Sequence, residues 1–371
     1  MKKFSRRSAC NRARAGFPAG VCIVAVCLVF NACSKAKTAN SGAAEDTLYL
    51  YNWTYYLPES VLDKFREEYK VKVVYDEYAS NEEMYAKIQA GGGGYDIVFP
   101  TSDFIEIMTQ QGMLAKIDHN KLNNVGNLEP RIVALAAWDP DMEYFIPYYY
   151  GAATISVNTA RIPEFDDSWK SWDIFERAAY KGKMTMLDDM RMVIGGALMK
   201  LGYSSNSANK AEIYAASSLI NNKWKPNIMR FDSEAFGKGY ASEDFWIVHG
   251  YFEGIKEEMG GNTALASKTA VFIPREGAPA YLDGMCILKD AKHKELAHKF
   301  IDFFLRPEIF AEFADYFNFP ATVNVPARAL LKNKPFLPVE EFLDKTMLNY
   351  DIGEAIQYYN SSWFETIRIG E

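Results

Sequence analysis

The fold is decided by residues 47–111, TLYLYNWTYYLPESVLDKFREEYKVKVVYDEYASNEEMYAKIQAGGGGYDIVFPTSDFIEIMTQQ, in which strand-like runs alternate with helix-like stretches. Apolar and aromatic runs of this length are typical of strands, and the longer stretches between them are typical of helices. We expect strands at 47–52, 71–78 and 95–99, and helices at 59–69, 81–90 and 103–111. This β-α-β-α-β succession predicts a parallel, doubly wound α/β sheet.

Polar and aromatic side chains follow all three of these strands. They are Asn52-Trp53-Thr54, Tyr78-Ala79-Ser80-Asn81 and Pro100-Thr101-Ser102-Asp103. Parallel sheets bind ligands at the carboxyl ends of their strands, so we expect these groups to meet on one rim. Gly91–Gly94 precedes a strand and lacks a following Lys-Ser/Thr, so it predicts a helix stop and a turn, not a phosphate loop.

The chain is long enough for two lobes, because about 326 residues follow position 45. The apolar stretch 144–157 predicts a strand that leaves the first lobe and enters the second, and 281–288 predicts the return crossover. We expect each lobe to be a mixed, mainly parallel sheet flanked by helices, with hinges at 150–154 and near Asp283. The first lobe is predicted over 46–150 and 284–320, and the second over 151–283 and 321–371. Further elements are predicted as helices at 169–180, 192–201, 211–221, 294–304 and 352–363, and as a strand at 183–187.

The N-terminal region has the pattern of a secretory leader with a lipid attachment site. Residues 1–33 carry six Lys or Arg and no acid, and the apolar run 21–30 is followed by Asn31-Ala32-Cys33. Ten apolar residues are too few to cross a bilayer, so a membrane-spanning helix is disfavoured. We expect a signal peptide over 1–32, lipidation of Cys33, and a flexible tether over 33–45. The protein would then be a membrane-anchored lipoprotein on the periplasmic side or at the cell surface.

Charge and cysteine content exclude several classes of function. The full chain has a net charge of −7, and loss of the six basic leader residues would leave about −13, a field that repels nucleic acid. Beyond the leader and Cys33 only Cys286 remains, so neither an internal disulfide nor a cysteine metal cluster is expected.

Catalytic signatures are scarce, and we expect neither an enzyme nor a cofactor or resident metal. The four histidines are scattered without ligand spacing, and no nucleophile elbow, Walker loop or metalloprotease helix is present. The adjacent acids Asp188 and Asp189 would point to opposite faces of a strand, so they cannot form the two jaws of a glycosidase, although one of them can face a cleft.

Several motifs resemble the spermidine/putrescine-binding proteins of bacterial polyamine importers. The motifs extend over nearly all of the chain beyond residue 45, and the resemblance implies a two-lobed periplasmic-binding-protein fold that closes over a linear polyamine and passes it to a membrane ABC permease. They are LYLYNWTYY at 48–56, SNE at 80–82, GYDIVFP at 94–100, IPYYYG at 146–151, LDDMR at 187–191, YLD at 281–283, FLRP at 304–307 and NFP at 318–320.

The same resemblance implies a set of ligand-binding residues. Asp189 and Asp283 match carboxylates that hold ammonium groups, and Thr101 matches a hydroxyl that contacts an amine. The remaining positions are aromatic walls, an amide and a neighbouring acid: Trp53, Tyr56, Asp103, Trp246, Tyr281, Phe319 and Asn349. For some of them a structural role is equally open: packing of the sheet end for Tyr56, a helix N-cap for Asp103, and core packing for Phe319 and Trp246.

The residues themselves support a cationic ligand. A polyamine is a methylene chain with ammonium groups, so its site needs aromatic faces and spaced carboxylates. A cation–π contact contributes roughly 0.5–2 kcal/mol, whereas an unpaired buried charge costs several, so the carboxylates decide the affinity. We rank Asp283 first, because an acid within an apolar run is costly unless it has a cationic partner, and Tyr281 lies two residues before it on the same strand face.

Three departures from the family pattern bear on specificity. Met192 stands where spermidine binders carry a second carboxylate, Tyr55 stands where an acid is usual, and Val248-His249 replaces a tryptophan, with Trp246 two residues upstream. The loss of two acids favours putrescine over spermidine. Alternatives that the sequence leaves open are the same fold with an amino acid or a metal chelate, a glycan-cleaving exoenzyme, and an adhesive surface protein.

Overall fold

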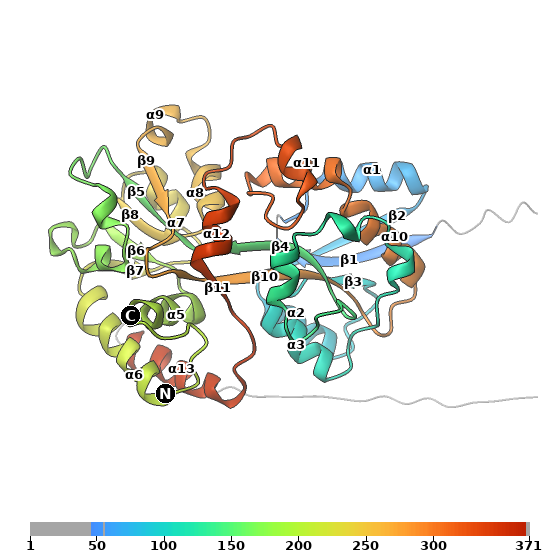
Figure 1. Cartoon of the computed structure of the whole chain (residues 1–371), viewed down its shortest axis with the longest axis horizontal. Helices are drawn as coiled ribbons and strands as arrows, with labels where there is room; N and C mark the ends of the chain where they lie inside the picture. The colour runs from blue at the N-terminus through green and yellow to red at the C-terminus, as the bar shows by residue number, and fades with distance from the viewer. Residues whose placement is uncertain (1–45, 55, 369–371) are drawn as a thin grey trace, which may run out of the picture. The chain divides into compact units, whose positions relative to one another are not determined.

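A computed structural model describes residues 46–54 and 56–368, which fold around two β-sheets (Figure 1). The predicted β-α-β-α-β succession is present and builds most of the first sheet. Its elements are β1 (Thr47–Trp53), α1 (Glu59–Tyr69), β2 (Lys72–Tyr78), α2 (Asn81–Gln89), β3 (Ile97–Val98) and α3 (Ser102–Gln110). Strand β1 lies between β2 and β3 and is parallel to both, as a doubly wound sheet requires.

Three further strands complete the first sheet, and two of them lead toward the second. Strands β4 (Ile146–Ala152) and β10 (Ala278–Ile287) pair with each other in antiparallel fashion, and β10 also pairs with β3 and with β11 (Thr346–Leu348). One residue, Ala153, separates β4 from the first strand of the second sheet. Figure 1 shows β4 and β10 side by side where the first sheet approaches the second.

The second sheet is also mixed, with the strand order β7-β6-β8-β5-β9. Its strands are β5 (Thr154–Asn158), β6 (Met184–Met186), β7 (Ile228–Phe231), β8 (Ile247–Gly250) and β9 (Thr269–Phe272). Strand β6 is parallel to β7 and β8, whereas β5 is antiparallel to β8 and β9. We call each sheet with the helices packed on it a lobe, and the predicted two-lobed α/β architecture is thereby confirmed.

The remaining helices cover both lobes. They are α4 (Pro130–Leu135), α5 (Met190–Lys200), α6 (Lys210–Leu219), α7 (Phe236–Ala241), α8 (Phe252–Met259), α9 (Thr263–Ala266), α10 (Lys294–Phe304), α11 (Pro307–Phe317), α12 (Val339–Lys345) and α13 (Ile356–Ser362). Helices α10 and α11 pack on the first lobe, and α13 packs against α5 and α6 in the second. None of the helices in the described part of the chain has the length and apolarity that crossing a bilayer requires. The lobe boundaries predicted along the chain stay a prediction.

Two predicted helices differ from the structure. The stretch 169–180 forms short 3₁₀ turns, Trp172–Glu176 and Ala178–Tyr180, after an earlier turn at Asp167–Trp169. The side chains of Asp166 and Ser171 each accept a backbone N–H at the start of a turn. Such local bonds compete with a continuous helix, which explains the error. The closing helix begins at Ile356, not at 352, because Gly353 has a φ of 55° that a regular helix does not adopt.

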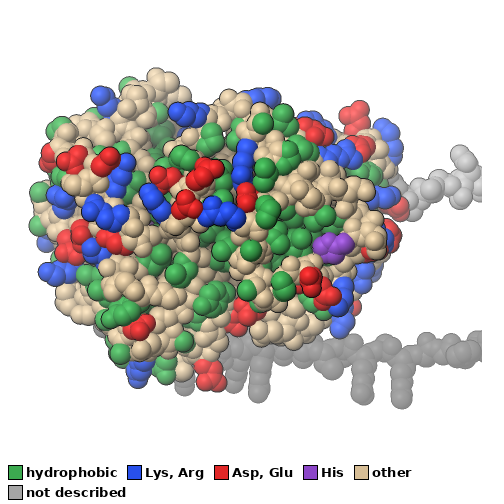
Figure 2. All heavy atoms as spheres, viewed as in Figure 1, with side chains coloured by type: hydrophobic (Ala, Val, Ile, Leu, Met, Phe, Trp, Pro, Cys, Tyr) green, Lys and Arg blue, Asp and Glu red, His purple; other side chains and the backbone are tan. Residues whose placement is uncertain are grey.

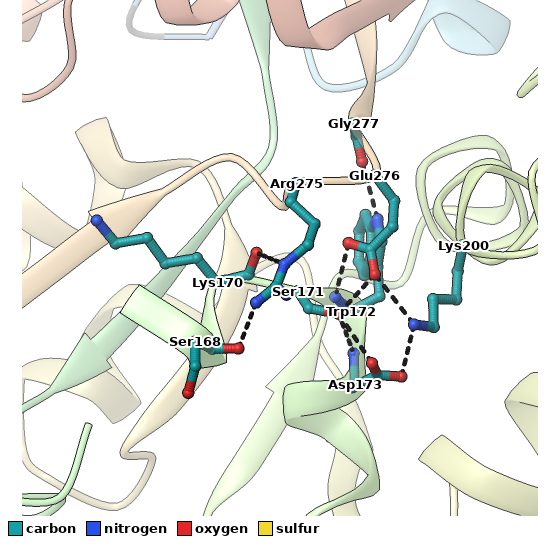
Figure 3. Close-up of polar contacts among 9 residues, drawn as sticks. All are labelled: Ser168, Lys170, Ser171, Trp172, Asp173, Lys200, Arg275, Glu276 and Gly277. Atoms are coloured by element: carbon teal, nitrogen blue, oxygen red, sulfur yellow. Dashed lines mark hydrogen bonds and ion pairs between the residues drawn. The ribbon is translucent and has the colours of Figure 1, made fainter. Parts of the chain in front are cut away.

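A polar network fixes the start of β10 to the second lobe (Figure 3). The indole Nε1 of Trp172 donates to the carbonyl of Gly277 at 2.8 Å. The carboxylate of Glu276 accepts bonds from the Ser171 hydroxyl at 2.5 Å and from Lys200 Nζ at 3.0 Å. Because Gly277 directly precedes β10, these bonds anchor the strand that carries Tyr281 and Asp283.

Candidate ligand-binding site

Asp283 lies on β10 at an irregularity that brings it against the rim of the first sheet. The register of β10 with β4 shifts between Asp283 and Gly284, and Asp283 forms an isolated bridge with Thr101. Only a glycine fits after it, because a Cβ on Gly284 would lie 2.6 Å from Ile105 and 2.7 Å from Phe145. The bulge therefore directs a carboxylate to the predicted ligand rim.

The carboxylate of Asp283 is buried, and no cationic side chain among the described residues pairs with it. Its residue is 2% exposed, and its Oδ1 has no hydrogen-bond partner among the described residues. Burial raises the pKa of Asp283 well above its usual range, a hydrogen bond with Tyr56 lowers it in part, and the charge of Asp103 raises it further. An ionised carboxylate at this place is costly unless a cation joins it, so the site suits a positively charged ligand.

Tyrosine side chains from both lobes surround Asp283. Tyr149 is its cross-strand partner on β4, and Tyr281 shares its strand face on β10; their rings lie 6.0 Å apart. The Tyr281 ring meets that of Tyr251 edge-on at 5.7 Å, and Tyr56 lies 6.3 Å from Tyr149. Burial raises the pKa of all four phenols well above 10, so they remain neutral hydrogen-bond donors at physiological pH.

Glu253 contributes a second carboxylate, which the sequence analysis missed. It lies in the first turn of α8, and its Oε1 accepts a hydrogen bond from the Tyr149 hydroxyl at 3.1 Å. Burial raises the pKa of Glu253 to about 7, and the bond from Tyr149 offsets only part of this effect. We call Asp283, Glu253 and the four tyrosines Tyr56, Tyr149, Tyr251 and Tyr281 the tyrosine–carboxylate cluster.

Asp189 approaches the same cluster from the second lobe. It is the N-cap of α5, and its Oδ1 accepts the Met192 N–H at 3.0 Å. Burial raises the pKa of Asp189, while the N–H groups of Met192 and Arg191 lower it. Its charge in turn raises the pKa of Tyr251, which places the two groups near each other. Asp188 is exposed and forms an ion pair with Arg368 at 2.9 Å, so only Asp189 of the adjacent acids faces this region.

Thr101 and Asp103 form the start of α3. Thr101 is the N-cap residue, and its hydroxyl donates to Asp103 Oδ1 at 2.5 Å and accepts from Asn81 at 2.7 Å. The N-cap interpretation of Asp103 is therefore wrong, since Asp103 lies in the first turn of the helix. The charge of Asp103 acts on both Asp189 and Asp283, which places it close to the predicted carboxylates.

Two further predicted residues border the tyrosine–carboxylate cluster. The Phe319 ring stacks on Tyr149 at 4.0 Å and lies 5.5 Å from Tyr56, so it supports the aromatic wall from behind and is itself buried. Asn349 is buried, its carbonyl accepts the Ser102 hydroxyl at 2.6 Å, and its amide Oδ1 has no partner among the described residues. The orphaned amide oxygen is a potential acceptor for a ligand N–H.

Trp53 and Trp246 are held by other parts of the protein. The Trp53 indole donates to the Phe99 carbonyl at 2.8 Å, and its ring lies 4.7 Å from Tyr78 at the end of β1. The Trp246 ring lies instead among Tyr180, Arg161 and Lys183, with Lys183 Nζ 5.3 Å from the ring centroid. Two side-chain cations already lie over this ring, so its position does not support the predicted ligand contact. Trp246 precedes β8, and its indole bonds the Glu243 carbonyl at 3.0 Å.

The sequence matches the bacterial extracellular solute-binding proteins over residues 60–339. The chain belongs to this family. It is similar to the spermidine/putrescine-binding periplasmic protein of Salmonella typhimurium, with 34% identity over 92% of this chain and 97% of the relative. It is also similar to the putrescine-binding periplasmic protein SpuD of Pseudomonas aeruginosa, with 31% identity over 95% of this chain and 99% of the relative.

Solved structures of such proteins share the fold. The TpPotD lipoprotein of Treponema pallidum has a TM-score of 0.83 and 44% identity, covering 86% of this chain and 99% of that chain. The spermidine/putrescine substrate-binding protein PotD of Streptococcus pneumoniae has a TM-score of 0.73 and 26% identity, covering 86% of this chain and 100% of that chain. The predicted resemblance is thus confirmed: this solute-binding protein is an extracytoplasmic transport component and not an enzyme.

Some predictions about the solute-binding protein fall outside the described residues. They concern the signal peptide over 1–32, the lipidated Cys33 with its tether, and Tyr55. Within the described residues, no group of three or more His, Cys, Asp or Glu side chains is arranged to hold a metal ion.

The missed residues had a usable signal in the sequence. Glu253 follows closely on the carboxyl end of β8, which is where the strand-end rule places ligand groups. Its contact with Tyr149, 104 positions away along the chain, could not be derived from local pattern. Tyr149 itself lies in the apolar IPYYYG motif, where neither neighbouring tyrosine is distinguished from it by sequence alone.

Proposed function

We propose that this solute-binding protein captures a linear polyamine, putrescine in preference to spermidine, and delivers it to a membrane ABC permease. The observation that carries the proposal is Asp283, a buried carboxylate with an orphaned oxygen and no ion pair among the described residues. An ammonium group would supply the missing charge and the missing hydrogen bond, and the surrounding phenol rings suit the methylene chain. Two relatives are named for the binding of spermidine or putrescine, and these ligands agree with this chemistry.

The binding residues of the proposed site come from both lobes. The crossover strands carry Asp283, Tyr281 and Tyr149. The first lobe contributes Thr101 and Asp103, and the second lobe contributes Asp189. Further residues line the surroundings of the site: Tyr56, Phe319, Asn349 and, at the end of β1, Trp53. A ligand that contacts both lobes binds the closed arrangement more tightly than the open one and therefore stabilises it. The permease would then recognise the closed, ligand-bound form. Because Asp283 is buried, we expect the ligand to enter while the lobes are apart.

The preference for putrescine rests on the side chain of Met192. It is buried next to Asp189 and apolar, at a position where the family resemblance implies a second acid in spermidine binders. An additional ammonium group there would be desolvated without an anion, which disfavours the longer triamine. Isothermal titration calorimetry with putrescine and spermidine tests the preferred amine and the polyamine function together. A clear preference for spermidine would overturn the proposed specificity for putrescine. The absence of binding heat with either amine would overturn the polyamine function.

An amino acid ligand is less well matched by the described residues. Its carboxylate would need a cation, and Arg191, whose charge acts on Asp189, already bonds the Asn206 side chain at 2.7 Å and the Tyr350 carbonyl at 3.3 Å. The surface also gives no support for nucleic acid as a partner. On the face shown in Figure 2, Lys and Arg side chains are intermixed with Asp and Glu side chains.

The membrane attachment is part of the proposal and rests on the N-terminal sequence pattern. We propose that cleavage exposes Cys33 and that its lipid anchors the protein at the membrane through the tether 33–45. Mass spectrometry of the protein from cells tests this. A diacylglyceryl or acyl adduct on Cys33 that disappears in the Cys33→Ser variant is expected, and release of an unmodified mature chain would overturn it.

A further inference from the structure

Glu253 is a carboxylate to which the proposed polyamine site assigns no ligand contact. It reaches from α8 of the second lobe to the Tyr149 hydroxyl on β4, at 3.1 Å. Tyr149 is in turn the cross-strand partner of Asp283, so this tyrosine connects the strand that carries Asp283 with the carboxylate of Glu253. The Tyr281 ring lies beside both, since the charges of Glu253 and Asp283 each act on its hydroxyl.

Lys256, the cation that follows Glu253 on α8, pairs with another part of the protein. Lys256 lies three residues further along α8, where helical spacing allows an ion pair with Glu253. Its Nζ instead donates to the Asn318 side chain at the end of α11, on the first lobe. No Lys or Arg among the described residues contributes to the charge balance of Glu253, whose environment is set by burial, its own backbone and Tyr149.

A purely structural role does not explain this arrangement. An acid in the first turn of a helix is stabilising when it lies near the exposed N–H groups, and it needs no burial for that effect. Glu253 is half-buried, and desolvation raises its pKa to about 7 although the Tyr149 hydroxyl donates a hydrogen bond to it. A second observation points in the same direction, because Asp283, which acts on the same Tyr149 and Tyr281 hydroxyls, is buried with an oxygen that has no partner among the described residues.

We infer that Glu253 is a second anionic subsite and a specificity residue, which takes the ammonium group at the end of the ligand opposite to the one held by Asp283. This inference rests on the proposed polyamine function. The ligand class it selects is a primary diamine: one ammonium pairs with Asp283, the methylene chain lies along Tyr149 and Tyr281, and the second ammonium pairs with Glu253. A monoamine would leave one of the two carboxylates without a partner, which is the basis of the discrimination.

The inference also requires a proton to move. A carboxyl group that is protonated in the empty site gives its proton to solvent when an ammonium group pairs with its carboxylate, so the complex forms with release of protons. The titratable groups on which the charge of Glu253 acts are Tyr149 from β4, Tyr281 from β10 and Tyr251, the N-cap residue of α8, and the charge of Asp283 acts on the same three tyrosines. The three tyrosines stay neutral near pH 7, which leaves the two carboxyl groups as the source of the protons.

The test compares putrescine with n-butylamine, which has the same chain and only one ammonium group. The variant is Glu253→Gln, which keeps the size and the acceptor for Tyr149, and the matched control is Glu257→Gln, an exposed acid on the same helix. Titration calorimetry on the full mature chain, in two buffers with different ionisation enthalpies, measures the affinities and the protons released. We expect Glu253→Gln to weaken putrescine binding at least tenfold, to change n-butylamine binding less than threefold, and to reduce the protons released at pH 7. The control should match the wild type in all three.

Each outcome separates this inference from the proposed function. If the wild type binds putrescine and Glu253→Gln binds it equally well with the same proton release, Glu253 is not a subsite, although the polyamine function stands. If the variant loses putrescine and n-butylamine equally, Glu253 supports the fold of the site and does not select diamines. If the wild type binds neither amine, the proposed function itself fails.

Discussion

Replacing Asp283 by Asn should move ligand affinity and stability of the empty protein in opposite directions. Asparagine keeps the shape of the side chain and its bond with Tyr56 but cannot pair with an ammonium group. Removing one partner of a buried charge pair costs about 2–5 kcal/mol, which corresponds to a rise in Kd for putrescine of about 30-fold to several thousand-fold. In the empty protein the same substitution removes a desolvated carboxyl group, so stability should rise or stay unchanged.

The sign of the stability effect follows from the direction of the pKa shift. The pKa of Asp283 is raised in the folded state, so above pH 3.8 the native protein holds a proton that the unfolded chain has released. Stability of the wild type therefore falls as pH rises from its ordinary pKa toward the raised one, and the Asn variant lacks this loss. The advantage of Asp283→Asn should accordingly be larger at pH 7 than at pH 4.

Urea unfolding with and without putrescine measures both effects in one experiment. At a ligand concentration 100 times the wild-type Kd, binding raises the unfolding free energy of the wild type by about 2.7 kcal/mol. With a Kd at least 30-fold higher, the variant should gain less than about 1 kcal/mol at the same concentration. A variant that unfolds more easily than the wild type without ligand, or that gains the full ligand stabilisation, would refute the assignment of Asp283 as the ammonium anchor.

Three other predictions concern His249, Asp189 and Met192. His249 is fully buried with neither ring nitrogen partnered among the described residues, and burial lowers its pKa to about 3, so below pH 6.5 the unfolded chain binds a proton that the native state excludes. The free energy of unfolding should then fall by up to roughly 1.4 kcal/mol per pH unit as pH drops from 6.5 toward 3. In urea titrations between pH 7.5 and 5, the His249→Phe variant, which keeps an aromatic ring, should lose less unfolding free energy than the wild type. Asp189→Asn keeps the N-cap of α5 but removes the charge, so putrescine binding should weaken at least tenfold while the helix content stays unchanged. The control Asp188→Asn alters only the exposed ion pair with Arg368 and should bind putrescine normally. Equal effects of the two substitutions would contradict the placement of Asp189. Met192→Glu should shift the ratio of putrescine to spermidine affinity toward spermidine by about tenfold, as one added charge pair implies, and an unchanged ratio in calorimetry would remove Met192 from the specificity argument.

The fold was largely predictable because its strands and helices have strong periodic patterns. The alternation over 47–111 gave every element of the first half of the first sheet within a residue or two. The stretch 169–180 failed because Ser171 and Asp166 satisfy backbone N–H groups locally, an effect that apolar spacing does not report.

The candidate site was predictable to the extent that single residues violate their local pattern. Asp283 was identified because an acid in an apolar strand needs a cationic partner, and the structure buries it with no such partner in the part of the chain that is described. Its bridge to Thr101 depends on a bulge at Gly284, and the contact of Glu253 with Tyr149 depends on how the lobes meet. Both are long-range features that no local pattern encodes. Trp246 was placed by analogy with a missing tryptophan, and its ring faces Arg161 and Lys183 instead.

The choice of tyrosine around the carboxylates has a physical consequence for capture. Lysine or arginine at these positions would pair with Asp283 and Glu253 in the empty protein, and a ligand would then have to displace them. Phenols with a raised pKa remain uncharged, so they donate hydrogen bonds without neutralising the carboxyl groups. Burial favours the neutral form of those carboxyl groups in the empty site, because it destabilises the ionised form that lacks a cationic partner. The empty site therefore avoids most of the cost of an unpaired buried charge, and the diamine supplies both cations at once. For this reason affinity for diamines should increase with pH between about 6 and 8, while affinity for a neutral analogue such as 1,4-butanediol should not. A pH-independent diamine affinity over this range would show that the carboxyl groups are already ionised in the empty protein.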